Sequence, residues 1–170
     1  MMSDLELRIR RLEDRAALDD LNVRYFLACD NDDYAGIGDI FSREAIFATS
    51  GKVAATGRDT IVEFIRVSRS HMGLTVHTPH YGLYTFIDDD HVQGLVGVHL
   101  ELVLGEETLF GAMRYQDEYR RTEDGWRVAS RNMRTIHIAP WSQVGQSLLS
   151  DTPVRWPGVQ PLPSDYPRQR

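Results

Sequence analysis

The chain has 170 residues, 42% of them hydrophobic and 26% charged, which is enough for one domain with a buried core. Its formal net charge of −6 argues against a nucleic-acid-binding protein, and no apolar run approaches the roughly 18 residues that a membrane span needs. Because the only cysteine, Cys29, cannot form an internal disulfide and the charged N-terminus lacks the apolar core of a signal peptide, we expect a cytoplasmic protein.

The N-terminal part of the chain is predicted to be helical. Apolar residues recur at helical spacing over residues 4–30, behind Ser3, a residue type that commonly caps helices. This helix should end at the sequence DNDD of residues 30–33. A short helical turn over residues 33–41 should then lead into a strand at residues 44–49.

A second helix is predicted to begin at Asp59 and to run to about residue 71, after a turn or short hairpin at residues 51–57. Beyond it, apolar β-rich runs separated by turn sequences predict four long strands, over residues 76–87, 92–104, 108–121 and 126–139. They should form a strongly curved antiparallel sheet. Several strands are apolar on both faces, so we expect helices on the concave side and another subunit on the convex side.

The last 31 residues differ in composition from the rest. Six of the seven prolines lie there, so little regular structure is expected, yet Trp141, Trp156 and Tyr166 are unusual for a free tail. We therefore predict one domain over residues 1–139 and an extension over residues 140–170. The extension should pack on its own domain or on a neighbouring subunit.

Three aspartates in residues 30–33 suggest a metal loop at first sight. A calcium-binding EF-hand loop that began at Asp30 would need an oxygen ligand, a glycine and a glutamate further on. The chain instead has Tyr34, Ala35 and Phe41. No metal site is therefore expected, and Asp32 and Asp33 are interpreted as solvated. Asp30 differs, because it falls on an apolar helical face, where a carboxylate needs a partner or a raised pKa.

The predicted order of elements and three motifs resemble a known family. Residues 5–138 are similar to the SnoaL-like branch of the nuclear-transport-factor-2-like superfamily. The similar segments are DDLNVRYFLACDNDDYAGIGDIFSREAIF near the N-terminus, TPHYGLY, and YQDEYRRTEDGWRVASRN. The last two resemble a strand and a hairpin of scytalone dehydratase and hexachlorocyclohexane dehydrochlorinase. The resemblance implies an α+β fold, with N-terminal helices packed on a strongly curved, mainly antiparallel sheet as a cone-shaped barrel, and a homo-oligomer, dimer or trimer.

The resemblance also implies site residues. Asp30 and His80 match a His–Asp pair in which the histidine removes a proton and the carboxylate fixes its tautomer. His99 falls at a second active-site histidine, Arg131 at an arginine that assists the leaving group, and Tyr25 at an active-site tyrosine of related dehydratases. The residues alone leave alternatives open: a core role for His80 and Tyr25, an outer face for His99, and a salt bridge for Arg131.

We therefore expect a cofactor-independent lyase of the dehydratase type, which acts on a small to medium hydrophobic cyclic substrate by acid–base elimination. No dinucleotide or nucleophile signature is present. One alternative is an isomerase of the ketosteroid type, or a polyketide-cyclase-like enzyme, with Asp30 as the base. Another is a non-catalytic module that binds a ligand or oligomerises. The substrate cavity is expected to be walled by aromatic residues, namely Phe47, Phe64, Tyr84 and Phe110.

Overall fold

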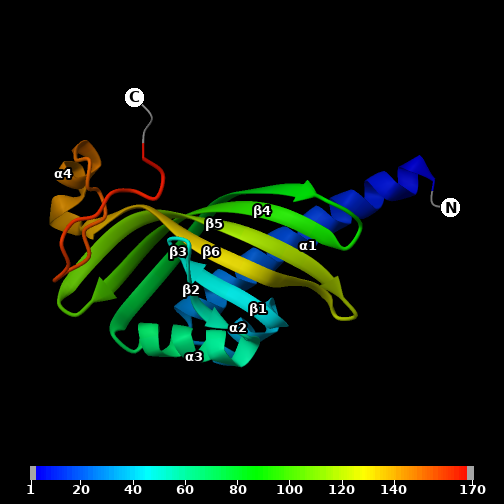
Figure 1. Cartoon of the computed structure of the whole chain (residues 1–170), viewed down its shortest axis with the longest axis horizontal. Coiled ribbons are helices and arrows are strands. Elements are labelled where there is room, and N and C mark those ends of the chain that lie inside the picture. Colours follow the sequence, from blue (N-terminus) through cyan, green and yellow to red (C-terminus); the bar gives the residue numbers. More distant parts are fainter. Residues whose placement is uncertain (1–2, 168–170) are drawn as a thin grey trace.

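In a computed structural model of the protein, which describes residues 3–167, helices cover one face of a single curved sheet (Figure 1). The elements are α1 (Asp4–Asp30), α2 (Tyr34–Ile40), β1 (Phe41–Thr49), β2 (Lys52–Thr56), α3 (Arg58–Arg69), β3 (Met72–Phe86), β4 (His91–Leu104), β5 (Glu107–Thr122), β6 (Gly125–Pro140), the 3-10 turn η1 (Trp141–Gln143) and α4 (Val144–Leu149). The sheet order is β2-β1-β6-β5-β4-β3. This confirms the predicted α+β fold class.

Helix α1 begins at a capping box. The Ser3 hydroxyl accepts from the Glu6 amide, and the Glu6 carboxylate accepts from the Ser3 amide, so two of the unpaired donors of the first turn are satisfied. Its C-terminal half buries Leu18 and Phe26 against the sheet, whereas its N-terminal half projects past the sheet edge in Figure 1. Among the described residues, no helix is both long and apolar enough to cross a membrane.

The DNDD sequence forms the junction between α1 and α2. Asp30 is the last residue of α1, Asp32 takes a left-handed backbone conformation, with a φ of 55°, and the Asp33 carboxylate caps α2 by accepting from the Gly36 amide at 2.9 Å. Asp33 is exposed, as predicted, and it also caps α2. The tight junction turns the chain back so that α2 leads directly into β1.

Strands β3 to β6 form the predicted antiparallel meander. β1 extends the sheet by pairing in parallel with β6. β1 also pairs with β2 in the short hairpin that the sequence predicted. β3 begins at Met72, earlier than predicted, because the turn after α3 is tighter than the sequence suggested. Thr75 and His77 therefore lie inside this strand, on the edge of the sheet nearest to α1.

The chain beyond β6 folds back on the sheet. Val154 forms a parallel bridge with Ile138 of β6 and an antiparallel bridge with Leu162. Further along, the Asp165 carboxylate accepts from the Thr135 amide at 2.7 Å and from the Ser50 hydroxyl at 2.8 Å. We call residues 141–167 the C-terminal strap. It packs on its own chain over the end of the sheet that α4 occupies in Figure 1.

Candidate active site

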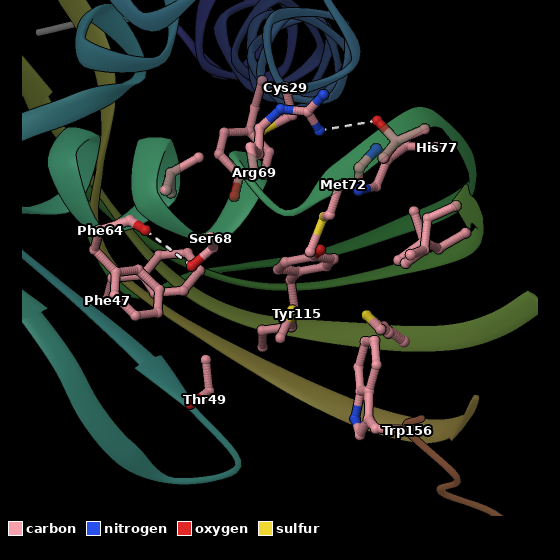
Figure 2. Close-up of a pocket in the computed structure, with 17 residues that line it drawn as sticks. Cys29, Phe47, Thr49, Phe64, Ser68, Arg69, Met72, His77, Tyr115 and Trp156 are labelled. Atoms are coloured by element: carbon pink, nitrogen blue, oxygen red, sulfur yellow. Dashed lines mark hydrogen bonds between the residues drawn. The ribbon is translucent and has the colours of Figure 1, made fainter. Parts of the chain in front are cut away.

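A cavity of about 200 Å³ lies on the concave side of the sheet (Figure 2). Residues of α1, α3, β1 and β3 to β6 line it, together with one residue of the C-terminal strap. Most of its walls are aliphatic or aromatic, and they include the expected Phe47 and Phe64. Its polar lining side chains are Tyr25, Cys29, Thr49, Ser68, Arg69, Thr75, His77 and Tyr115.

Asp30 and His77 form a hydrogen-bonded pair at the cavity wall. Asp30 Oδ1 lies 2.6 Å from His77 Nδ1, and Asp30 Oδ2 accepts from the His77 backbone amide at 2.9 Å. Phe26 stacks on the His77 ring, with centroids 5.3 Å apart and planes 21° apart. Since the carboxylate accepts the proton of Nδ1, Nε2 is the ring nitrogen left to take a proton from a bound molecule.

The surroundings of Asp30 keep it ionised. Its partial burial would raise the pKa of the carboxyl group, but hydrogen bonds from the His77 ring, the His77 amide and the Thr75 hydroxyl together lower that pKa below its usual value. An anionic Asp30 can orient a neutral His77 and can stabilise the imidazolium that forms when His77 takes up a proton.

Arg69 extends this pair into a chain of hydrogen bonds. Its Nη1 donates to Thr75 Oγ1 at 2.9 Å (Figure 2). Its Nε donates to Asp32 Oδ1. Because the guanidinium can only donate, the Thr75 hydroxyl must direct its own proton to Asp30, 2.8 Å away. Asp32, expected to be merely solvated, thus anchors the arginine that fixes the hydroxyl beside the Asp30–His77 pair.

Two tyrosines form a floor beneath the cavity, and Arg131 lies behind them. The guanidinium carbon of Arg131 is 4.3 Å from the centroid of the Tyr25 ring and 5.0 Å from that of Tyr115. Arg131 is fully buried and makes a two-pronged ion pair with Asp117, at 2.9 and 2.7 Å. The sequence predicted that Arg131 would contact the leaving group, but Arg131 does not line the cavity. It instead supports the two tyrosine rings that do.

Both tyrosines of this floor remain protonated at neutral pH. Burial raises the pKa of Tyr25 and of Tyr115, and the nearby Arg131 offsets only part of that effect. A protonated phenol can donate a hydrogen bond to a hydroxyl or halide on a bound molecule. Tyr25, which the sequence placed among the site residues, lines the cavity beside the previously unexpected Tyr115.

The expected pairing of Asp30 with His80 is corrected by the structure. His77 pairs with the concave-facing Leu100 across the β3–β4 ladder, whereas His80 is exposed and lies at an irregularity in the register between residues 79 and 81. Side chains three apart on a strand point to opposite faces. The histidine that faces the cavity is therefore the first of the HTPH sequence, and the second one faces away.

His99 also lies outside the cavity. Its neighbours Val98 and Leu100 are buried, whereas His99 is only partly buried, so it points to the outer face of β4. There its ring meets that of His80 with centroids 4.3 Å apart. The expectation that His99 would be an active-site residue is replaced by a place in an outer-face cluster, which continues to Phe110 at 5.3 Å.

Two of the four aromatic residues expected to wall the cavity lie elsewhere. Phe110 belongs to the outer-face cluster, where it also meets Trp141. Tyr84 is buried under α1, and its hydroxyl donates to Asp19 at 2.8 Å and accepts from Asn22 at 3.2 Å. Phe110 is outside the cavity because it lies on the outer face of the sheet, and Tyr84 because it lies further along β3, where it packs under α1.

Sequence reasoning missed several lining residues. Thr75 and His77 share one face of β3, so a Thr-x-His pattern near the start of a strand was the available signal. Tyr115 lies on the same face of β5 as the buried Met113, two residues earlier. Arg69 and Trp156 carry no local signal, because tertiary contacts alone bring them to the cavity.

A known protein family matches most of this chain. The model of the SnoaL-like domain family matches residues 10–132 of the chain. The chain belongs to the SnoaL-like domain family. This confirms the family resemblance predicted from the sequence. The matched residues of this SnoaL-like protein include the Asp30–His77 pair and Arg69, and they exclude the C-terminal strap. A search of curated protein sequences found no match.

Solved structures place this SnoaL-like protein within the nuclear-transport-factor-2-like fold. LinA superposes with a TM-score of 0.74 at 25% identity, over 79% of this chain and 94% of LinA. A hexachlorocyclohexane dehydrochlorinase, LinA-type3 from Novosphingobium barchaimii, gives 0.73 at 22% identity over 79% and 94% of the two chains. A candidate scytalone dehydratase from Novosphingobium aromaticivorans DSM 12444 gives 0.73 at 15% identity over 79% and 91%.

Proposed function

We propose that this protein is a cofactor-independent lyase in which His77 is the general base and Asp30 its orienting partner. The observation that carries the proposal is the 2.6 Å contact between His77 Nδ1 and Asp30 Oδ1 at the wall of an apolar cavity. The similarity to LinA and to a hexachlorocyclohexane dehydrochlorinase supports the same reaction class. A buried, hydrogen-bonded His–Asp pair is the arrangement that removal of a carbon-bound proton requires.

The elimination would proceed in the following way. His77 Nε2 takes a proton from a ring carbon, the electrons of that C–H bond form a double bond, and the bond to the leaving group on the adjacent carbon breaks. Asp30 stabilises the imidazolium. Tyr25 and Tyr115 donate hydrogen bonds to the departing group, while Arg131 behind both rings supports negative charge at their hydroxyls. A departing hydroxyl takes the phenol proton of Tyr25 or Tyr115 and leaves as water, and that tyrosine then recovers a proton from the His77 imidazolium, directly or through solvent.

The size of the cavity narrows the substrate class. An apolar protein cavity of about 150 Å³ is sufficient to hold benzene. The space beside His77 is about 200 Å³, so it favours a single six-membered ring with one or two small substituents. Within the small to medium cyclic compounds expected from the sequence, we therefore propose one-ring hydroxyketones as the first substrates to test.

The isomerase alternative, with Asp30 as the base, is less well supported. Asp30 already accepts three hydrogen bonds, from the ring and the amide of His77 and from Thr75, and its pKa is lowered. A carboxylate in that state is a weak base. The two schemes differ in the variant that loses most activity, because an Asp30 base would survive the loss of the His77 ring better than a His77 base.

The first prediction concerns His77 itself. With 3-hydroxycyclohexanone as substrate and formation of the conjugated ketone followed by absorbance, His77→Ala should lower kcat by about 10²- to 10⁴-fold, because the general base is lost. Asp30→Asn should lower kcat less, since the base remains but loses its orienting charge. The matched control is His80→Ala, which removes an exposed histidine from the opposite face of the same strand.

The His80→Ala control shows which of the two histidines is the general base. His80→Ala should keep kcat within about twofold of the unmodified protein, as most exposed substitutions leave function intact. Loss of activity in His80→Ala with full activity in His77→Ala would overturn the assignment of the base. Complete loss in Asp30→Asn alone would favour the isomerase scheme.

A further inference from the structure

We propose that Trp156 limits the size of the ring that the cavity accepts, so that the C-terminal strap is a specificity element of the site. The inference rests on the proposed function in one respect, namely that the cavity beside His77 is where the substrate binds. It adds a residue that lies outside the segment matched by the SnoaL-like family, at residues 10–132.

Trp156 is the one lining residue that the strap contributes. The other residues around the cavity all lie within residues 25–133, on helices and strands of the barrel. Figure 2 shows the Trp156 indole at the far side of the view from Arg69 and His77. The polar chemistry and the indole thus come from different parts of the chain. A change at Trp156 can alter the shape of the cavity without touching the Asp30–His77 pair.

The backbone around Trp156 is held in place. Two residues before it, the buried Val154 bridges Ile138 and Leu162, and the Arg155 amide donates to the Ile138 carbonyl at 2.7 Å. The Trp156 carbonyl accepts from the Val159 amide at 3.1 Å, which closes a turn after it. The indole is therefore positioned by a paired segment and is not carried by a free coil.

The place of the indole predicts what its removal would do. Trp156 is partly buried and packs against the core cluster. Its side chain is among the largest, so truncation to alanine would extend the cavity towards the strap by roughly the volume of a second ring. Because this new space lies away from His77, affinity for two-ring molecules should rise, while the kcat of a one-ring substrate should change little.

The test compares two ketones on the full-length protein. Cyclohexanone has one ring and 1-tetralone has two, and their dissociation constants can be measured by calorimetry without any turnover. For the unmodified protein we expect tighter binding of cyclohexanone. Trp156→Ala should shift the ratio of the two dissociation constants by about tenfold in favour of 1-tetralone, the scale on which apolar pockets discriminate between ligands that differ in size.

The matched control is Trp141→Ala. Trp141 belongs to the same strap, is 64% exposed and meets Phe110 on the outer face, so its removal should leave the ratio within about twofold. Trp156→Phe keeps an aromatic ring of smaller size and should shift the ratio in the same direction by a smaller factor. It also serves if Trp156→Ala does not fold. An unchanged ratio in a folded Trp156 variant would overturn the proposal.

The outcomes separate this inference from the proposed function. Ring selectivity that depends on Trp156, without turnover of 3-hydroxycyclohexanone, would support the specificity role and contradict the lyase. Turnover that depends on His77, with a ratio insensitive to Trp156, would support the lyase and contradict the specificity role. Failure of both ketones to bind the unmodified protein would contradict the cavity as a ring-binding site and, with it, this inference.

Discussion

At the scale of single residues, Thr75 lies outside the Asp30–His77 pair and adds to the effect of His77 in lowering the pKa of Asp30. Its hydroxyl accepts from Arg69 and donates to Asp30, so its orientation is set from both sides. A carboxylate whose pKa is lowered by folding stabilises the folded state above its unfolded pKa, near 3.9 for aspartate, and that stabilisation is lost as the pH falls through the folded pKa.

We predict that Thr75→Val raises the pKa of Asp30 towards the usual aspartate value, because valine has nearly the same shape but no hydroxyl to donate. The pKa can be followed by carbon NMR of the Asp30 carboxyl group during an acid titration. Asp30 should then contribute less stability above its unfolded pKa, and the part of the stability that is lost in acid should be smaller than in the unmodified protein. Thr78→Val on the exposed face of the same strand is the control, and equal titration curves for both variants would contradict the role of Thr75.

At the scale of elements, the site depends on the meeting of α1, α3 and β3. Asp32 lies just beyond the end of α1, Arg69 is the last residue of α3, and Thr75 lies in β3. The arginine is only 8% exposed, and its planar fork donates to both partners at once. Lysine carries one compact ammonium group on a flexible stem and reproduces such a two-partner geometry poorly.

Arg69→Lys should therefore lower kcat by about tenfold while KM changes less than about twofold, because the substitution loosens Thr75 and Asp30 without reshaping most of the cavity. The comparison variant is Arg66→Lys, one turn earlier on α3, where the arginine is exposed and packs over Tyr34. A merely structural role of Arg69 would lower the stability of Arg69→Lys but leave the kcat of the folded variant close to that of Arg66→Lys. An increase of KM alone in Arg69→Lys would indicate that Arg69 binds substrate rather than positions the pair.

Helices and strands differ in how well the sequence alone predicts the direction of their side chains. Helical periodicity is local, so it correctly placed Asp30 at the end of α1. The direction of a strand residue depends on register, and the irregularity at residues 79–81 is set by pairing with β4, which no local pattern records. His80 was favoured because the segment TPHYGLY resembles the histidine-bearing strand of related enzymes, whereas His77 is the histidine that lines the cavity. Arg69 and Trp156 reach the site through tertiary contacts, which the spacing of residues along the sequence does not reveal.

At the scale of the whole molecule, a buried polar network ties the helical layer to the sheet. Asn22 of α1 contacts the Arg131–Asp117 pair, and Tyr119 donates to Asp117 at 2.6 Å. Asp117 and Arg131 are both almost fully removed from solvent. Two opposite buried charges stabilise a fold only as long as both are present, because each compensates for the desolvation of the other.

Asp117→Asn should accordingly lower the free energy of unfolding by about 3–5 kcal/mol, the cost of leaving the Arg131 charge buried without its partner. Urea denaturation followed by circular dichroism measures this loss. The neighbouring Glu118→Gln is the control, since Glu118 points to the other face, is partly exposed and meets His91. Similar losses in the two variants would show that the buried pair contributes no more than a surface one.

The position of Trp156 also has a consequence for the order of events during synthesis. All six strands precede it in the chain, so the whole sheet and both long helices leave the ribosome before the indole does. A domain generally folds as a unit, so folding follows once enough of its chain has been made. The segments that carry Asp30 and His77 are thus made before the residue that forms one wall of the cavity, and the cavity is complete only when the strap has been added.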